Sequence, residues 1–188
     1  YVYLGGTTAA PTLSLSTTGH SQAPNGVETK TGDTTLTLVG MVYTNASTQF
    51  VDTALSRTCL NWFNRRKIIG DNATQPGYTF SNTTMAEINT ALRITFLCWA
   101  DDVPFVSASG TVSMAAQGTA SLATSIDSVG NQYTPSQNMS MAAAFSSGFS
   151  GQGALGLAEG WHFTLCIAAV NTSTATLVNL QTIVQING

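Results

Sequence analysis

Residues 35–67 read TLTLVGMVYTNASTQFVDTALSRTCLNWFNRRK, and this stretch decides the fold. Its beginning, residues 36–43, is rich in β-branched and apolar side chains, which favour a strand. Its end, residues 58–65, alternates in part between apolar and polar side chains, and we expect a second strand there. The residues between them, 44–56, carry Asn, Ser, Thr and Asp, which favour turns through local hydrogen bonds. The stretch therefore predicts two strands joined by a polar loop.

The composition supports an all-β protein. Only 8% of the 188 residues are charged, whereas about 25% is typical. The hydrophobic fraction of 43% argues against a disordered chain. Thr, Ser, Asn, Gln and Gly take the place of charge, and they suit half-buried strands and turns. We expect residues 1–188 to form a single β-sandwich domain, and the strand-like start at residues 1–4 suggests a piece of a longer polypeptide.

Short apolar runs alternate with turn signals along the chain, and this spacing is typical of a sandwich or barrel. Residues 93–100, RITFLCWA, predict a buried central strand, whereas residues 81–90 fit a short helix or a loop equally well. Trp62, Trp99 and Trp161 lie in strands and are expected to pack in the core. We predict an antiparallel β-sandwich, jelly-roll-like, with ten or more short strands and at most one short helix.

Parts of the chain resemble a domain near the C-termini of tailed-bacteriophage fibre and spike proteins, which are virion appendages. The similar segments are LVGMVYT at 38–44, a polar loop ending in Asp-x-x-x-x-Arg, and NWFNRR at 61–66. Residues 1–3, 93–100 and 125–127 look similar as well, so the resemblance covers about residues 1–130. The motif residues, which the resemblance implies are structural, are Asp52, Arg57, Asn61, Trp62, Phe63, Asn64, Arg65 and Arg66.

The resemblance implies a structural domain of a bacteriophage virion, cut from a longer fibre or appendage protein. It implies a homotrimer that contacts other virion proteins and attaches to a polysaccharide of the host surface. Its location would be the virion, an extracellular particle assembled in the bacterial cytoplasm. Two alternatives stay open: a capsid-decorating or baseplate protein without a receptor role, and a carbohydrate-binding module of a secreted protein.

The charge pattern bears on the class of partner. A surface so poor in charge is unusual for a free monomer and more natural in an assembled particle. The net charge of −3 argues against nucleic-acid binding, which needs a basic face. No run of about 18 apolar residues is present, so we expect no membrane insertion.

The sequence offers no catalytic constellation, and we expect no enzymatic activity, no metal and no cofactor. Cys59, Cys98 and Cys166 lie in apolar runs, where buried structural thiols are the usual outcome. Asp101 and Asp102 lack the further ligands that calcium requires. A formal G-x-G-x-x-G at residues 151–156 precedes another apolar strand rather than a helix, so we interpret residues 148–160 as a glycine-rich hairpin loop.

A glycan site combines aromatic rings with groups that hydrogen-bond hydroxyls. Predicted loops offer five candidate glycan contacts: Asp101, Asp102, Asn131, Gln132 and Tyr133.

Overall fold

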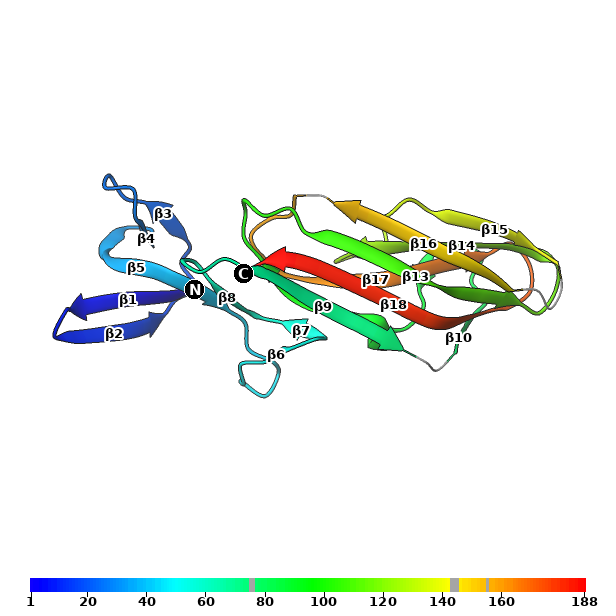
Figure 1. Cartoon of the computed structure of the whole chain (residues 1–188), viewed down its shortest axis with the longest axis horizontal. Coiled ribbons are helices and arrows are strands. Elements are labelled where there is room, and N and C mark those ends of the chain that lie inside the picture. Colours follow the sequence, from blue (N-terminus) through cyan, green and yellow to red (C-terminus); the bar gives the residue numbers. More distant parts are fainter. Residues whose placement is uncertain (75–76, 143–145, 155) are drawn as a thin grey trace. The chain divides into compact units, whose positions relative to one another are not determined.

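The computed structural model describes residues 1–74, 77–142, 146–154 and 156–188, and its folding pattern is shown in Figure 1. These residues form β-strands and one short 3₁₀ turn, η1 (Thr90–Leu92). Almost all strand pairs are antiparallel, with β7 and β12 as a parallel pair among the described strands. The predicted all-β, antiparallel sandwich with at most one short helix is therefore confirmed.

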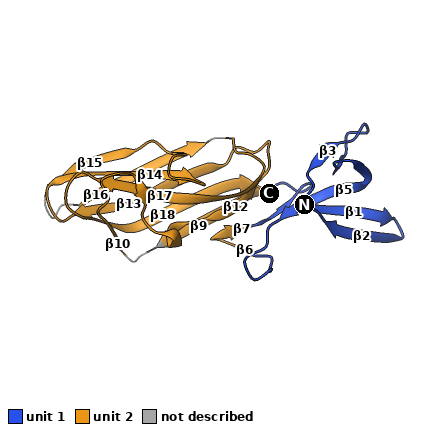
Figure 2. Ribbon diagram, turned by 180° about the vertical axis from the view of Figure 1, so that it is seen from behind, with its two compact units in different colours: residues 1–52, 58–66, 188 blue, residues 53–57, 67–187 orange. Residues whose placement is uncertain are grey.

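Two compact units make up the chain, coloured separately in Figure 2. Unit 1 comprises residues 1–52, 58–66 and 188, and unit 2 comprises residues 53–57 and 67–187. Whether these units unfold together, as the single domain expected over residues 1–188, stays a prediction.

Unit 1 is built on one antiparallel sheet with the order β2-β1-β5-β4-β3, and β8 pairs with β5. Tyr3 and Leu38 face each other across β1 and β5, and both are fully buried. Together with Met41 and Leu60 they form the small core of this unit. The strand bounds are β1 (Val2–Thr7), β2 (Ala10–Leu15), β3 (His20–Gln22), β4 (Glu28–Lys30), β5 (Asp33–Val42) and β8 (Cys59–Asn61).

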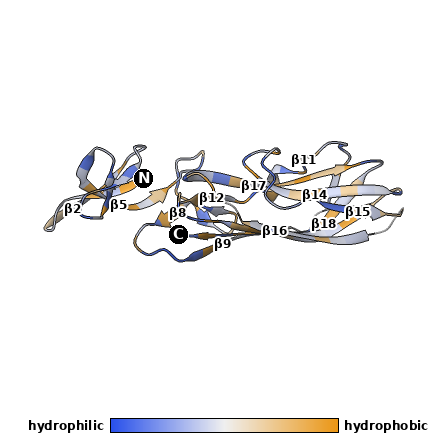
Figure 3. Cartoon of the chain, turned by 90° about the horizontal axis from the view of Figure 1, so that it is seen from above, coloured by the Kyte–Doolittle hydropathy of each residue, from blue (hydrophilic) through white to orange (hydrophobic). Residues whose placement is uncertain are grey.

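Unit 2 contains two sheets, which Figure 3 shows as two layers with β14 and β17 in one and β16 and β18 in the other. The first sheet consists of β9 (Lys67–Thr74), β10 (Tyr78–Phe80), β13 (Phe105–Met114), β16 (Ser146–Ala154) and β18 (Ala175–Asn187). Apart from Asp52, which belongs to unit 1, the second consists of residues of unit 2: β6 (Asp52–Thr53), β7 (Ser56–Arg57), β11 (Ala86–Glu87), β12 (Thr95–Cys98), β14 (Gly118–Ile126), β15 (Gln137–Met141) and β17 (Gly160–Val170).

The core of unit 2 lies between its two sheets. Strand β17 is almost entirely buried, as is β12, which fits their near-continuous apolar sequences. Trp99 is fully buried as predicted, whereas Trp62 and Trp161 are only partly buried. The main cluster consists of Phe80, Leu92, Val112, Met114, Ala120, Leu122, Met141, Cys166, Ala168, Val170, Ala175, Leu177 and Leu180.

The strand predicted over residues 58–65 ends early, at Asn61. The Asn61 side-chain oxygen accepts hydrogen bonds from the backbone N–H groups of Phe63 and Asn64, at 2.9 and 2.8 Å. This local bonding replaces the strand ladder and turns the chain. The prediction of a strand through residue 65 was therefore wrong, and residues 62–64 form a bend.

The structure also tests the predictions made for residues 81–90 and 148–160. Residues 81–90 form a loop that includes β11, so the loop alternative is confirmed over the helix. The hairpin loop expected over residues 148–160 was wrong in part, because β16 continues to Ala154 and pairs with β13 along its whole length. Residue 155, within that segment, lies outside the described residues.

The three cysteines are free thiols in this structure. Burial raises the pKa of Cys98 to about 12, and the nearby carboxylates of Asp102, Asp101 and Glu159 add to the effect. Burial also raises the pKa of Cys166 to about 12. Cys59 is half-buried, and the pKa of its thiol is raised as well. Burial is the larger cause, and the negative charge of the Asp52 carboxylate is the smaller one.

We expect Cys98 and Cys166 to resist alkylation in the native protein at about pH 8, because the thiolate is the reactive form. In denaturant both should react at the rate of ordinary thiols. Since their folded pKa values lie above the unfolded value, the stability of the fold should fall as pH rises from about 9 towards 12. Mass spectrometry after timed alkylation measures the rates, with Cys59→Ser isolating the buried pair. Fast native labelling of that variant would contradict the assignment.

Candidate functional site

Three of the five predicted glycan contacts come together in unit 2. Asn131, Gln132 and Tyr133 line a pocket of about 170 Å³ with Ile126, Asp127 and Leu157. The pocket is smaller than the roughly 300–1,000 Å³ of typical small-molecule sites. Any ligand would therefore rest on its rim instead of being enclosed.

Asp101 and Asp102 do not line this pocket. Asp102 is 4% exposed, and its carboxylate accepts hydrogen bonds from the backbone N–H of Val103 and from the backbone and side chain of Asn187. Asp102 therefore ties β18 to the turn before β13, which is a structural role. Asp101 is exposed on the same turn.

Asp127 holds one wall of the small pocket. Its backbone takes a left-handed φ of 63°, which Asp tolerates better than most residues. Its carboxylate accepts from the Phe163 N–H at 3.0 Å and contacts His162 Nδ1 at 2.7 Å. His162 Nε2 lies 2.8 Å from the Ala158 carbonyl oxygen. Both contacts are with acceptors, so both ring nitrogens donate only when the imidazole is protonated.

The opposite wall, residues 131–134, is fixed by backbone bonds. The N–H groups of Tyr133 and Thr134 both donate to the Thr124 carbonyl. The Gln132 amide nitrogen donates to the Thr134 carbonyl at 2.8 Å and so has little freedom to bind a ligand. The Asn131 side chain is exposed and makes no hydrogen bond in the part of the chain that is described, so it can serve as a donor or acceptor.

The glycines of β16 explain how this wall fits against the sheet. A Cβ added at Gly153 would lie 2.4 Å from the Tyr133 carbonyl oxygen. A Cβ at Gly151 would lie 3.3 Å from the Thr134 hydroxyl. The Gly-x-Gly spacing that formally matches a dinucleotide motif therefore serves close packing of residues 133–134 onto a strand.

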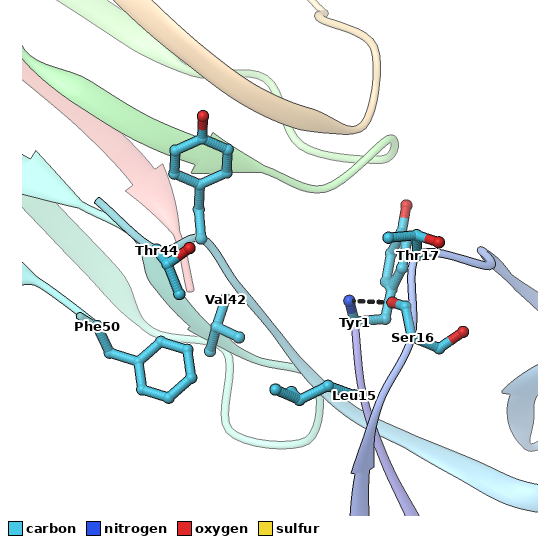
Figure 4. Close-up of a pocket in the computed structure, with 8 residues that line it drawn as sticks. Tyr1, Leu15, Ser16, Thr17, Val42, Thr44 and Phe50 are labelled. Carbon is cyan, nitrogen blue, oxygen red and sulfur yellow. Dashed lines mark hydrogen bonds between the residues drawn. The ribbon is translucent and has the colours of Figure 1, made fainter. Parts of the chain in front are cut away.

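A larger pocket of about 570 Å³ lies in unit 1, and sequence reasoning did not find it. Figure 4 shows the side chains around it, with Phe50 and Val42 from one part of the unit and Tyr1, Ser16 and Thr17 from another. Leu15, Tyr43 and Thr44 complete the lining. None of these side chains is charged, so they suit an uncharged ligand.

Local bonding positions the Phe50 ring at this pocket. Asn45 Oδ1 accepts from the N–H groups of Ser47 and Gln49, at 2.9 and 3.0 Å. This closes a tight loop in which Thr44 and Phe50 pair directly. Phe50 is 57% exposed and Tyr43 is 46% exposed. The signal that could have found the site is an aromatic residue at each end of a polar loop.

Trp62 and Arg65 of the NWFNRR segment form a stack with His20 and Tyr1. Arg65 lies 4.1 Å from the Trp62 ring centre, and the Trp62 ring lies 5.2 Å from His20. His20 contacts the Tyr1 ring at 5.7 Å, and its Nδ1 lies 2.7 Å from Glu28 Oε2. The stack links the β3–β4 hairpin to the start of β1.

The remaining motif residues are dispersed. Arg57 Nε donates to the Ile69 carbonyl at 2.8 Å, and Arg66 exchanges backbone hydrogen bonds with Gly188. Asp52 is exposed in β6, and Phe63 is 66% exposed. These residues do not form one site, and their shared structural role stays a prediction.

Within the described ranges, no cluster of three or more His, Cys, Asp or Glu side chains is arranged to hold a metal ion. Among the same residues, no helix has the length and apolar character needed to cross a bilayer.

No protein-family model and no curated protein sequence matches this chain. Similar solved structures include the EclA C-terminal domain, described as a sugar-binding protein, with 12% identity, a TM-score of 0.36, and coverage of 59% of this chain and 79% of that chain. Another is infectious bursal disease virus, Gx strain, with 9% identity, a TM-score of 0.29, and coverage of 80% of this chain and 45% of that chain. These similarities are too distant to define a family or a function.

We expect Gly153→Ala to destabilise unit 2 by about 1–3 kcal/mol, because the added methyl group collides with the Tyr133 backbone. Gly156→Ala is the matched control, since a Cβ there has nothing within 4 Å. Urea unfolding measures both. Equal stability of the two variants would show that residues 131–134 do not pack on β16 in this way.

Proposed function

We propose that this chain is a structural domain of a bacteriophage fibre or related virion appendage, and that it attaches to an uncharged glycan of the host surface. The observation that carries the attachment role is the unit 1 pocket. It combines exposed rings of Tyr43 and Phe50 with the hydroxyl groups of Ser16, Thr17 and Thr44. Its volume of about 570 Å³ lies within the usual range of ligand sites.

Sugar recognition follows from this chemistry. The apolar face of a pyranose ring can stack on an aromatic side chain, while neighbouring hydroxyls exchange hydrogen bonds with Ser and Thr. No side chain of the lining is a carboxylate or a cation, so neither acidic nor basic sugars gain a charged side chain as a partner. A single open pocket binds weakly, and many copies on one particle would supply avidity.

The distribution of charge supports an assembled particle. Residues 1–27 contain no Asp, Glu, Lys or Arg, and residues 103–188 contain only Asp127 and Glu159. Free proteins usually carry charge over their whole surface for solubility. Long uncharged stretches with exposed side chains are better suited to contact with other virion proteins. The homotrimer implied by the fibre resemblance remains part of this proposal.

A carbohydrate-binding module of a secreted protein is the second candidate, because the same pocket favours it. Labelled antibody against the chain separates the two candidates by showing whether the protein is on virus particles. A position on the head or baseplate, together with no glycan binding, would favour a decorating or baseplate protein.

We expect the full chain to bind neutral hexose oligosaccharides on an array better than sialylated ones. Phe50→Ala and Tyr43→Ala should each weaken binding roughly 2- to 10-fold, the size expected for losing one ring contact. Phe63→Ala is the matched control, since Phe63 is an exposed ring of the same unit outside the pocket. Preference for acidic glycans, or equal loss in the Phe63 variant, would refute binding at this pocket.

A further inference from the structure

The β1–β2 hairpin of unit 1 exposes a ladder of apolar side chains. Val2 lies directly opposite Leu15, and Leu4 lies directly opposite Leu13, so the four side chains share one face. Leu13 is 70% exposed, Leu15 65% and Leu4 38%. Every residue of β2 is exposed, and β2 forms an edge of its sheet.

The hydrogen bonds of the hairpin show which backbone groups face outward. Tyr1 and Ser16 exchange both backbone bonds, at 2.8 and 3.1 Å. Bonded and non-bonded pairs alternate in an antiparallel ladder, so the Leu13 and Leu15 pairs are non-bonded. The N–H and C=O groups of Leu13 and Leu15 therefore point away from β1, and the described chain provides no partner for them.

This edge lacks the usual protection against strand pairing. Natural edge strands are blunted by charged residues, by proline or by bulges. No charged residue occurs in residues 1–27, and the register of β1 with β2 is unbroken. Pro11 is the one protective residue in β2, and it lies near the turn, away from Leu13 and Leu15.

We propose that β2 pairs antiparallel with β2 of a second copy of this chain, about a two-fold axis at Ser14. In this register Leu13 of each copy lies opposite Leu15 of the other. The four outward N–H groups and the four outward C=O groups of these leucines then satisfy one another. The apolar ladder continues across the axis, with all eight side chains on one face.

The choice of occupant follows from the strand itself. Centring the axis on Leu13 would place Leu15 opposite Pro11, which has no N–H to donate. An uncharged strand meets its own copy without electrostatic repulsion, whereas it offers no counter-charge to an acidic or basic partner.

A disulfide test measures the register. Ser14 would face its own counterpart in a non-bonded pair, with Cα atoms about 4.5 Å apart, which suits a disulfide. We expect Ser14→Cys, in a Cys59→Ser background, to form a covalent dimer rapidly with a copper–phenanthroline oxidant. Thr12→Cys is the matched control, because it lies on the same face of β2 but its counterpart would be four residues further along. Equal crosslinking of both variants would overturn the register.

Light scattering of the full chain measures the assembly. We expect a species of twice 19.6 kDa, or six times that mass if a trimer also forms. Leu13→Lys should remove the two-fold contact, while Leu55→Lys, at an exposed leucine of unit 2, should not. A monomer or trimer that neither variant changes would overturn the pairing. Leu13 does not line the unit 1 pocket, so a failure of the pairing proposal does not affect the glycan-array test of that pocket.

Discussion

The apolar layer between the two sheets of unit 2 is the interaction on which the rest of that unit, the larger of the two, depends. Strands β13, β14, β17 and β18 supply most of it, and each contributes fully buried side chains. With so few charges available, the hydrophobic effect and the backbone ladders provide most of the stabilisation. The turns of unit 2 and its small pocket are carried on this layer, so their geometry is set by which strands the layer brings together.

At the ends of strands, short polar side chains accept hydrogen bonds from backbone N–H groups. Asn45, Asn61, Asp102 and Asp127 each accept two or more hydrogen bonds, mostly from backbone N–H groups left free where the ladders stop. Such bonds cost little side-chain entropy and need no counter-ion. A chain poor in Lys and Arg can therefore hold well-defined loops, including the one that presents Phe50.

Unit 1 combines two exposed features in one small sheet. Leu15 contributes its side chain to the pocket lining and its backbone groups to the free edge of β2. The two proposals use different groups of Leu15, its backbone for the pairing and its side chain for the pocket, so each can be tested without the other.

The sequence by itself determined the fold class, the burial of Trp99 and the three thiols in apolar strands, because strand periodicity and apolar runs are local signals. It also placed Asn131, Gln132 and Tyr133 in one loop. Only the tertiary structure decided that the Asp102 carboxylate would accept hydrogen bonds from Asn187, 85 residues away. It also decided that the backbone of Tyr133 would pack closely against Gly153. It also decided that Phe50 would meet Leu15 at one pocket. These contacts join segments far apart in the chain, and no local pattern encodes which strands become neighbours.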